Sequence, residues 1–190
     1  MAVPRMGLAL ACFVANALCF CAWATASQQL PLDLAGRAVD PFAAGSKLTV
    51  LVFVRTDCPL SNRYAPEIQH LARRYASHGV NFWLVYPDNA ETPAGIQEHL
   101  AAYGYTLPAL RDAHHFLVRM AEATVTPEAA VFRGSKLLYH GRIDNRVQDF
   151  GQTRVVVTAH DLEDAIAAAL DNKPIPPAVQ AVGCYISDLR

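Results

Sequence analysis

Cys58 is the residue of this chain with the clearest chemical potential, and it stands in the sequence Cys-Pro-Leu-Ser at residues 58–61. A cysteine thiolate is the nucleophile both in disulfide exchange and in the reduction of peroxides. Ser61, three residues later, cannot form a disulfide, but its hydroxyl could hydrogen-bond the thiolate. A second cysteine, Cys184, follows 126 residues after Cys58 and could resolve a disulfide formed there.

The residues around Cys58 predict a buried strand that leads directly into a helix. Residues 48–54 are mostly apolar or β-branched, which is typical of a strand covered on both faces. Apolar residues then recur at helical spacing, at Leu60, Tyr64, Ile68, Leu71 and Tyr75. Cys58 is therefore expected at a helix N-terminus, where free amide groups and the helix dipole lower a thiol pKa. Arg55 and Arg63 could strengthen this effect, whereas Asp57 would oppose it.

The rest of the chain predicts alternating strands and helices, followed by a hairpin and a last helix. The predicted elements are a strand at 80–86, a helix after Thr92, a short strand at 107–112, a helix at 116–123, a strand at 125–132, its hairpin partner at 137–144 and a helix capped by Thr158. Strand–helix–strand units with short joints indicate parallel strands joined by right-handed crossovers. Asp144 is expected in a solvated charge cluster with Arg142 and Arg146.

The first 26 residues have the pattern of a secretory signal peptide. Arg5 precedes a stretch without charged residues, 6–26, which ends in Ala24-Thr25-Ala26, a small-x-small cleavage site. We expect an exported protein, periplasmic or extracellular, although residues 6–26 are also long enough to remain as a membrane anchor. The other predicted parts are an N-terminal extension at 27–45, one domain at 46–173 and a tail at 174–190 that carries Cys184.

Cleavage of the signal would change the cysteine count. Of the five cysteines, Cys12, Cys19 and Cys21 would leave, so that Cys58 and Cys184 remain. In an oxidising compartment such a pair is either a structural staple or a nucleophile with its resolving partner, and both alternatives stay open. The formal net charge is −1, without a basic patch, which argues against nucleic acid as a partner.

Cys58, Pro59, Pro66 eight residues after the cysteine, and Pro127 at the start of a strand together resemble the thioredoxin-like superfamily. The chain is most similar to exported redoxins related to the alkyl hydroperoxide reductase/thiol-specific antioxidant family. The resemblance implies an α/β fold of three layers, α/β/α, around a central mixed sheet. It also implies that Pro127 is a cis-proline facing Cys58.

The resemblance further implies that Pro59, Ser61, Arg63, Thr126 and Pro127 support the active site. The superfamily usually has a second cysteine at the position of Ser61, so this chain has a monothiol version of the motif.

Three functions agree with this pattern. The first is a thiol–disulfide oxidoreductase without cofactor, in which Cys58 attacks disulfides of proteins or small molecules and Cys184 or an external thiol resolves the mixed disulfide. The second is a thiol-dependent peroxidase, in which Cys58 becomes a sulfenic acid that condenses with Cys184. Peroxiredoxins normally have Pro-x-x-x-Thr-x-x-Cys, and here Leu51 and Arg55 occupy the proline and threonine positions.

The third function is a non-enzymatic metallochaperone or assembly factor. Copper-delivering relatives with this fold use Cys-x-x-x-Cys and a distant histidine, but the second cysteine position is Asn62 here. His114, His115 and His140 are the histidines considered as ligands, and we expect no metal site.

Overall fold

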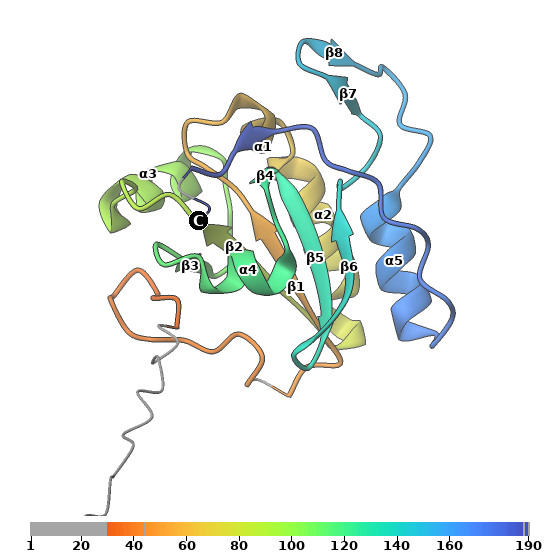
Figure 1. The fold of residues 1–190 in the computed structure, drawn as a ribbon, viewed down its shortest axis with the longest axis horizontal. Helices are drawn as coiled ribbons and strands as arrows, with labels where there is room; N and C mark the ends of the chain where they lie inside the picture. Colours follow the sequence, from red (N-terminus) through yellow and green to blue (C-terminus); the bar gives the residue numbers. More distant parts are fainter. Residues whose placement is uncertain (1–29, 44, 188, 190) are drawn as a thin grey trace, which may run out of the picture.

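A five-stranded sheet forms the centre of the computed structural model, which describes residues 30–43, 45–187 and 189 (Figure 1). The predicted signal peptide lies outside the described residues. The strand order is β3-β2-β1-β5-β6, with bounds β1 Leu48–Phe53, β2 Val80–Tyr86, β3 Ala109–Arg111, β5 Glu128–Arg133 and β6 Lys136–Gly141. β1, β2 and β3 are parallel, whereas β5 runs antiparallel to both β1 and β6. The sheet is therefore mixed, as predicted.

Helices cover both faces of this sheet. The helices are α1 Pro59–Arg63, α2 Ala65–Tyr75, α3 Pro93–Ala102, α4 Phe116–Ala121 and α5 Asp161–Leu170, with a 3-10 turn, η1, at Ala76–His78. The buried side chains of α2 and α5 share one apolar cluster with one face of the sheet, and those of α4 belong to a second cluster on the other face. These layers confirm the predicted three-layer α/β/α fold.

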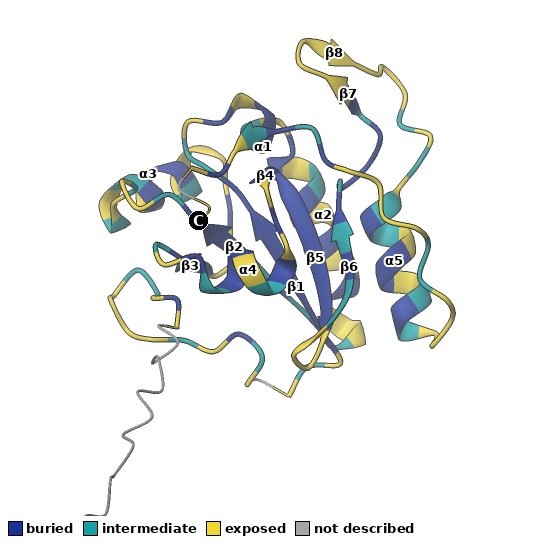
Figure 2. Cartoon of the chain, viewed as in Figure 1, coloured by how far each residue is buried: buried dark blue, intermediate teal, exposed yellow. Residues whose placement is uncertain are grey.

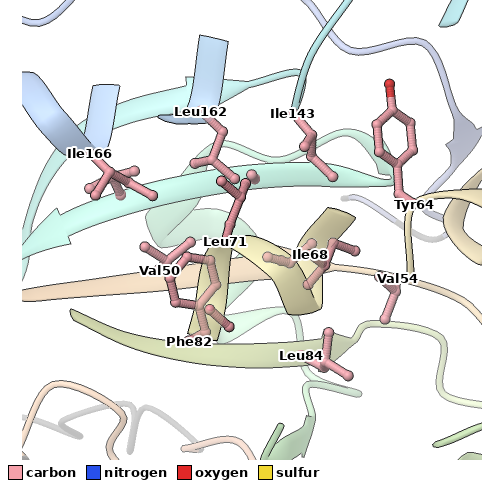
Figure 3. Packing of buried hydrophobic residues seen from close by; sticks show 14 of the residues in the cluster. Val50, Val54, Tyr64, Ile68, Leu71, Phe82, Leu84, Ile143, Leu162 and Ile166 are labelled. Atoms are coloured by element: carbon pink, nitrogen blue, oxygen red, sulfur yellow. The ribbon is translucent and has the colours of Figure 1, made fainter. Parts of the chain in front are cut away.

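The alternation of side chains along β1 explains why this strand is buried on both faces. Val50 and Val52 belong to the first cluster, whereas Leu51 and Phe53 belong to the second. Figure 3 shows the first cluster, in which side chains of α2 and α5 pack over β1 and β2. Figure 2 shows the central strands in the colour of buried residues, with exposed residues on the outer sides of the helices. Seven successive apolar or β-branched residues were thus a correct signal for this strand.

The helix after Cys58 differs from the prediction because it is interrupted at Tyr64. Pro66 lies within the first two positions of α2, where its missing amide costs no hydrogen bond, and α1 ends just before it.

The predicted cap of the last helix is wrong. The Asn145 side chain donates a hydrogen bond to Thr158 Oγ1 at 2.7 Å, and the Thr158 amide donates to Asn145 Oδ1 at 3.0 Å. Because its hydroxyl and amide are engaged in this way, Thr158 fixes a loop, and α5 begins later, at Asp161.

Two short strand pairs were not predicted. One is a hairpin of β7 Val147–Asp149 and β8 Gln152–Thr153. The other joins β4 Val125–Thr126 to β9 Cys184–Tyr185 and thereby attaches the C-terminal tail to the strand that precedes β5. Figure 1 shows the dark blue tail leaving the lower end of α5 and crossing to β4. In the described part of the chain, no helix is both long and apolar enough to span a membrane.

Candidate active site

Cys58 is the residue that precedes α1, and it lies just beyond the C-terminal end of β1. Its backbone is extended, with φ −88° and ψ 109°, as is usual for an N-cap residue. The residue is only 1% exposed. Its thiol donates a hydrogen bond to the backbone oxygen of Thr126 at 3.1 Å, which ties the nucleophile to β4. The peptide bond between Thr126 and Pro127 is cis.

The tail carries the second cysteine to this place. In the antiparallel pair of β4 and β9, Cys184 stands opposite Thr126, and Tyr185 stands opposite Val125. The Thr126 hydroxyl donates to the backbone oxygen of Cys184 at 3.4 Å, and the Ile186 amide donates to the backbone oxygen of Thr124 at 3.0 Å. Both cysteines are free thiols in this structure. The pairing of the tail thus places a second thiol beside the first.

Two glycines allow the tail to lie this close. A Cβ on Gly183 would stand 2.4 Å from the backbone oxygen of Thr126 and 2.7 Å from its carbonyl carbon. A Cβ on Gly141 would stand 2.5 Å from the backbone oxygen of Val179, which accepts a hydrogen bond from the Arg142 amide at 2.9 Å. Real Cβ atoms do not approach backbone atoms so closely, so a side chain at either position would push the tail away.

The two thiols have opposite pKa shifts. Burial alone would raise the pKa of Cys58, but hydrogen bonding from the Cys184 thiol and from the Ser61 amide and hydroxyl outweighs it, so the pKa of Cys58 lies below its ordinary value. Burial raises the pKa of Cys184 to about 12, and its hydrogen bond to Cys58 and the negative charge on Cys58 add to this. Of the two thiols, Cys58 therefore loses its proton more readily, and Cys184 keeps its proton.

Arg55 has a different role from the one predicted for it. Its guanidinium forms ion pairs with Asp57 at 3.0 Å and Asp88 at 3.2 Å, so much of its charge is compensated. The same group donates to the backbone oxygen of Tyr185 at 3.5 Å and so contacts the tail. It also lies close enough to Cys184 to lower the pKa of that thiol slightly.

The supporting residues predicted from the sequence lie in two different environments. Ser61 and Thr126 are buried next to Cys58, and the Ser61 hydroxyl accepts a hydrogen bond from the Arg55 amide at 3.4 Å. Pro59 and Arg63 are exposed on α1. The first pair can act directly on the thiol, whereas the second pair faces solvent.

Comparison with known proteins identifies the family. The family model described as Redoxin matches residues 25–135, more than half of the chain. The chain belongs to the redoxin family. Family and fold together support a thioredoxin-like redox function. No similar sequence was found among curated proteins.

Solved structures similar to this redoxin come from several bacteria. An uncharacterized conserved protein from Geobacillus kaustophilus is 25% identical with a TM-score of 0.71, covering 84% of this chain and 89% of that one. A hypothetical protein from Sinorhizobium meliloti is 26% identical with a TM-score of 0.71, covering 83% and 88%. A structure of dsbF from Mycobacterium tuberculosis, at 18% identity and a TM-score of 0.53, covers 76% and 95% and agrees in fold.

Glu128 is a site residue that the sequence analysis missed. Its buried carboxylate accepts hydrogen bonds from the amides of Thr124 at 2.9 Å and Val125 at 3.3 Å. These bonds fix β4, the strand that contacts both cysteines. The signal was present in the sequence, because an acidic residue directly after Pro127 is out of place in an otherwise apolar strand.

A second missed group connects α1 of this redoxin to α3. His99 Nδ1 lies 2.9 Å from the Tyr86 hydroxyl, and His99 Nε2 lies 2.8 Å from Asn62 Oδ1. The Asn62 side chain in turn donates to the backbone oxygen of Thr56 at 3.1 Å. Burial lowers the pKa of His99, which favours the neutral ring. Asn62 thus holds the loop before Cys58 in place.

The predicted solvated cluster around Asp144 is wrong. Asp144 is only 2% exposed, and its carboxylate accepts a hydrogen bond from the Tyr64 hydroxyl at 2.7 Å. Arg146 contacts both partners, with an ion pair to Asp144 at 3.3 Å and its guanidinium 5.2 Å from the centre of the Tyr64 ring. Burial and this carboxylate raise the pKa of Tyr64. The residue that interrupts the helix after Cys58 is therefore tied to the loop after β6.

The histidines considered as metal ligands lie in separate environments. His115 Nε2 donates to the backbone oxygen of Pro87 at 3.0 Å, whereas His140 lies 3.6 Å from Glu128 and 3.8 Å from Glu122. Across residues 30–43, 45–187 and 189, no three His, Cys, Asp or Glu side chains are arranged as a metal site.

Proposed function

We propose that this redoxin is an exported thiol–disulfide oxidoreductase in which Cys58 is the nucleophile and Cys184 the resolving thiol. The observation that carries the proposal is the pairing of β9 with β4, which sets Cys184 opposite Thr126. The backbone oxygen of Thr126 accepts the hydrogen bond from the Cys58 thiol, so both cysteines lie at the same residue of β4. Both cysteines are free thiols, and their pKa values are shifted in opposite directions, which supports a nucleophile with a resolving partner rather than a structural disulfide.

The reaction has two exchange steps. The Cys58 thiolate attacks a substrate disulfide, forming a mixed disulfide while one substrate sulfur leaves as a thiolate and takes up a proton. Cys184, after losing its proton, attacks the Cys58 sulfur, so that the second substrate thiol is released and a Cys58–Cys184 disulfide remains. The substrate is reduced and the protein is oxidised by the same two electrons. An external dithiol returns the protein to its reduced form.

The charges of the two thiols order these steps. While Cys58 is a thiolate, its charge and hydrogen bond help to keep Cys184 protonated. Once Cys58 is part of a mixed disulfide, that charge is gone, and the pKa of Cys184 falls. The Cys184 thiol therefore loses its proton more readily after the first step than before it, while its burial still opposes this loss.

Export is supported by the signal-like pattern of residues 1–26. The domain boundaries at 27–45, 46–173 and 174–190 remain part of the proposal. Reduction of peroxides remains the alternative function. It would use the same nucleophile, Cys58, and the same resolving thiol, Cys184.

The test compares Cys184→Ser and Cys58→Ser with the unchanged chain. With reduced protein, a symmetric chromogenic disulfide and no free reductant, the unchanged chain should release two equivalents of chromogenic thiol and form the Cys58–Cys184 disulfide. Cys184→Ser should release one equivalent and accumulate a mixed disulfide at Cys58, visible by mass spectrometry, and Cys58→Ser should be inactive. Release of two equivalents by Cys184→Ser without a trapped adduct would contradict the resolving role, and activity in Cys58→Ser would contradict the nucleophile.

A further inference from the structure

We infer that the edge of β4 beside Cys58 binds an extended polypeptide segment with a Gly-Cys sequence, and that the tail is a built-in copy of such a segment. This inference deepens the proposed function and rests on it. The substrate class is therefore a protein or peptide disulfide in which the attacked cysteine follows a glycine.

The tail shows what the β4 edge accepts. β4 and β9 form a separate two-stranded sheet, so β9 is the strand that pairs with β4 there. If the tail leaves, the backbone oxygen of Thr124 loses the Ile186 amide, and the Thr126 hydroxyl loses the backbone oxygen of Cys184. The Thr124 oxygen can then accept, and the Thr126 hydroxyl can then donate, a hydrogen bond to the backbone of another extended chain. Such main-chain pairing does not depend on the side chains of the incoming strand.

The position of the sulfur fixes the register of the incoming chain. A substrate can react only if its sulfur reaches Cys58, and the tail brings Cys184 there when that residue stands opposite Thr126. A substrate strand that pairs with β4 in the same direction must place its own cysteine opposite Thr126. Each neighbouring residue of the substrate then meets the surroundings that its counterpart in the tail meets.

The residue before the cysteine must be glycine in this register. A Cβ on Gly183 would lie within 2.4 Å of the Thr126 oxygen and 3.1 Å of its nitrogen. The atoms in the way belong to the backbone of β4, which Glu128 holds through the Thr124 and Val125 amides, so they cannot move aside as a flexible side chain would. Glycine is required here because there is no room for a Cβ, and not because the backbone adopts a left-handed conformation.

The second selective position lies two residues after the cysteine. Ile186 is 5% exposed and belongs to the apolar cluster that also contains Phe53 of β1 and Ala121 of α4. Tyr185, between these two positions, is 79% exposed, so the protein does not select a particular side chain at this position. The pattern that the edge selects is therefore glycine, cysteine, any residue, and a large aliphatic residue.

The tail and a substrate segment exclude each other, because both use the same edge. After the mixed disulfide has formed, the substrate strand must leave β4 before Cys184 can return and attack the Cys58 sulfur. The bond between Cys58 and the substrate sulfur then breaks as the Cys58–Cys184 bond forms, and the substrate leaves as a thiol.

The test uses peptides with the sequence of residues 180–187, each joined through its cysteine to the same chromogenic aromatic thiol. The protein is Cys184→Ser, so that the colour reports attack by Cys58, with the adduct located by mass spectrometry. Three variant peptides replace the glycine, the tyrosine or the isoleucine by alanine. Their intrinsic reactivity is compared by their reaction with glutathione.

The peptide with alanine for glycine should react at least about tenfold more slowly than the parent, from overpacking. Loss of the isoleucine should also slow the reaction by about tenfold or more. The tyrosine variant is the matched control and should keep the parent rate. Equal rates for all four peptides would overturn the inference and leave the proposed function standing. No attack by Cys58 on any peptide or on a simple aromatic disulfide would refute the proposed function itself.

Discussion

Replacement of Gly183 by alanine should release the tail from β4 without changing either cysteine. The new Cβ would stand 2.4 Å from the Thr126 oxygen, so the pairing of β9 with β4 cannot persist in its present form. Gly95→Ala is a suitable control, because a Cβ there would be 3.4 Å from Oγ1 of Thr92, the N-cap residue of α3, and more than 4 Å from any atom of β9.

The magnitude follows from the contacts that hold the tail. Burial of the Ile186 side chain contributes about 1.5–3 kcal/mol, and the hydrogen bond of its amide to Thr124 contributes about 0.5–1.5 kcal/mol. The loss of both would cost about 2–4.5 kcal/mol, which lowers the equilibrium constant for docking roughly 30- to 1,600-fold. The docked tail leaves Cys58 only 1% exposed, so alkylation of this thiol depends on the fraction of open molecules.

The assay is the alkylation rate of Cys58 as a function of pH, read by mass spectrometry. In Gly183→Ala the plateau at high pH should rise by at least about tenfold, following the larger open fraction. The reasoning is refuted if Gly183→Ala and Gly95→Ala both keep the plateau of the unchanged chain.

Two further predictions concern buried carboxylates. Glu128→Ala leaves the Thr124 and Val125 amides without their acceptor. It should therefore lower the free energy of unfolding in urea by about 1–3 kcal/mol and speed the alkylation of Cys58, whereas Glu128→Gln should have a much smaller effect. An unchanged alkylation rate in Glu128→Ala would contradict a role of this residue in holding β4. Burial raises the pKa of Asp112 to about 6 from 3.8, so the stability contributed by this group is fully present below the lower value and is lost as the pH rises through the higher one. The stability of the unchanged chain relative to Asp112→Asn should therefore fall between about pH 4 and about pH 7, by at most roughly 3 kcal/mol, and a constant difference in urea unfolding across this range would contradict the shift.

The central fold could be predicted because its signals are local. The apolar run of β1, the proline at the start of α2 and the position of Cys58 between them are properties of adjacent residues. β9 could not be predicted, because two residues carry no periodicity and the pairing depends on a distant strand. The burial of Asp144 was missed for the same reason, since its partner Tyr64 lies 80 residues earlier.

The tail is made after the domain that it covers, and this affects how the protein is assembled. Thr126 and Cys184 are separated by 58 residues, so the sheet can form around an uncovered Cys58 before its cover is synthesised. A newly made chain therefore passes through a stage in which this thiol is open to any disulfide nearby. A protease that cut between Lys173 and Gly183 would make that stage permanent, leaving an α/β core in which Cys58 can still attack disulfides but depends on an external thiol to release what it has bound.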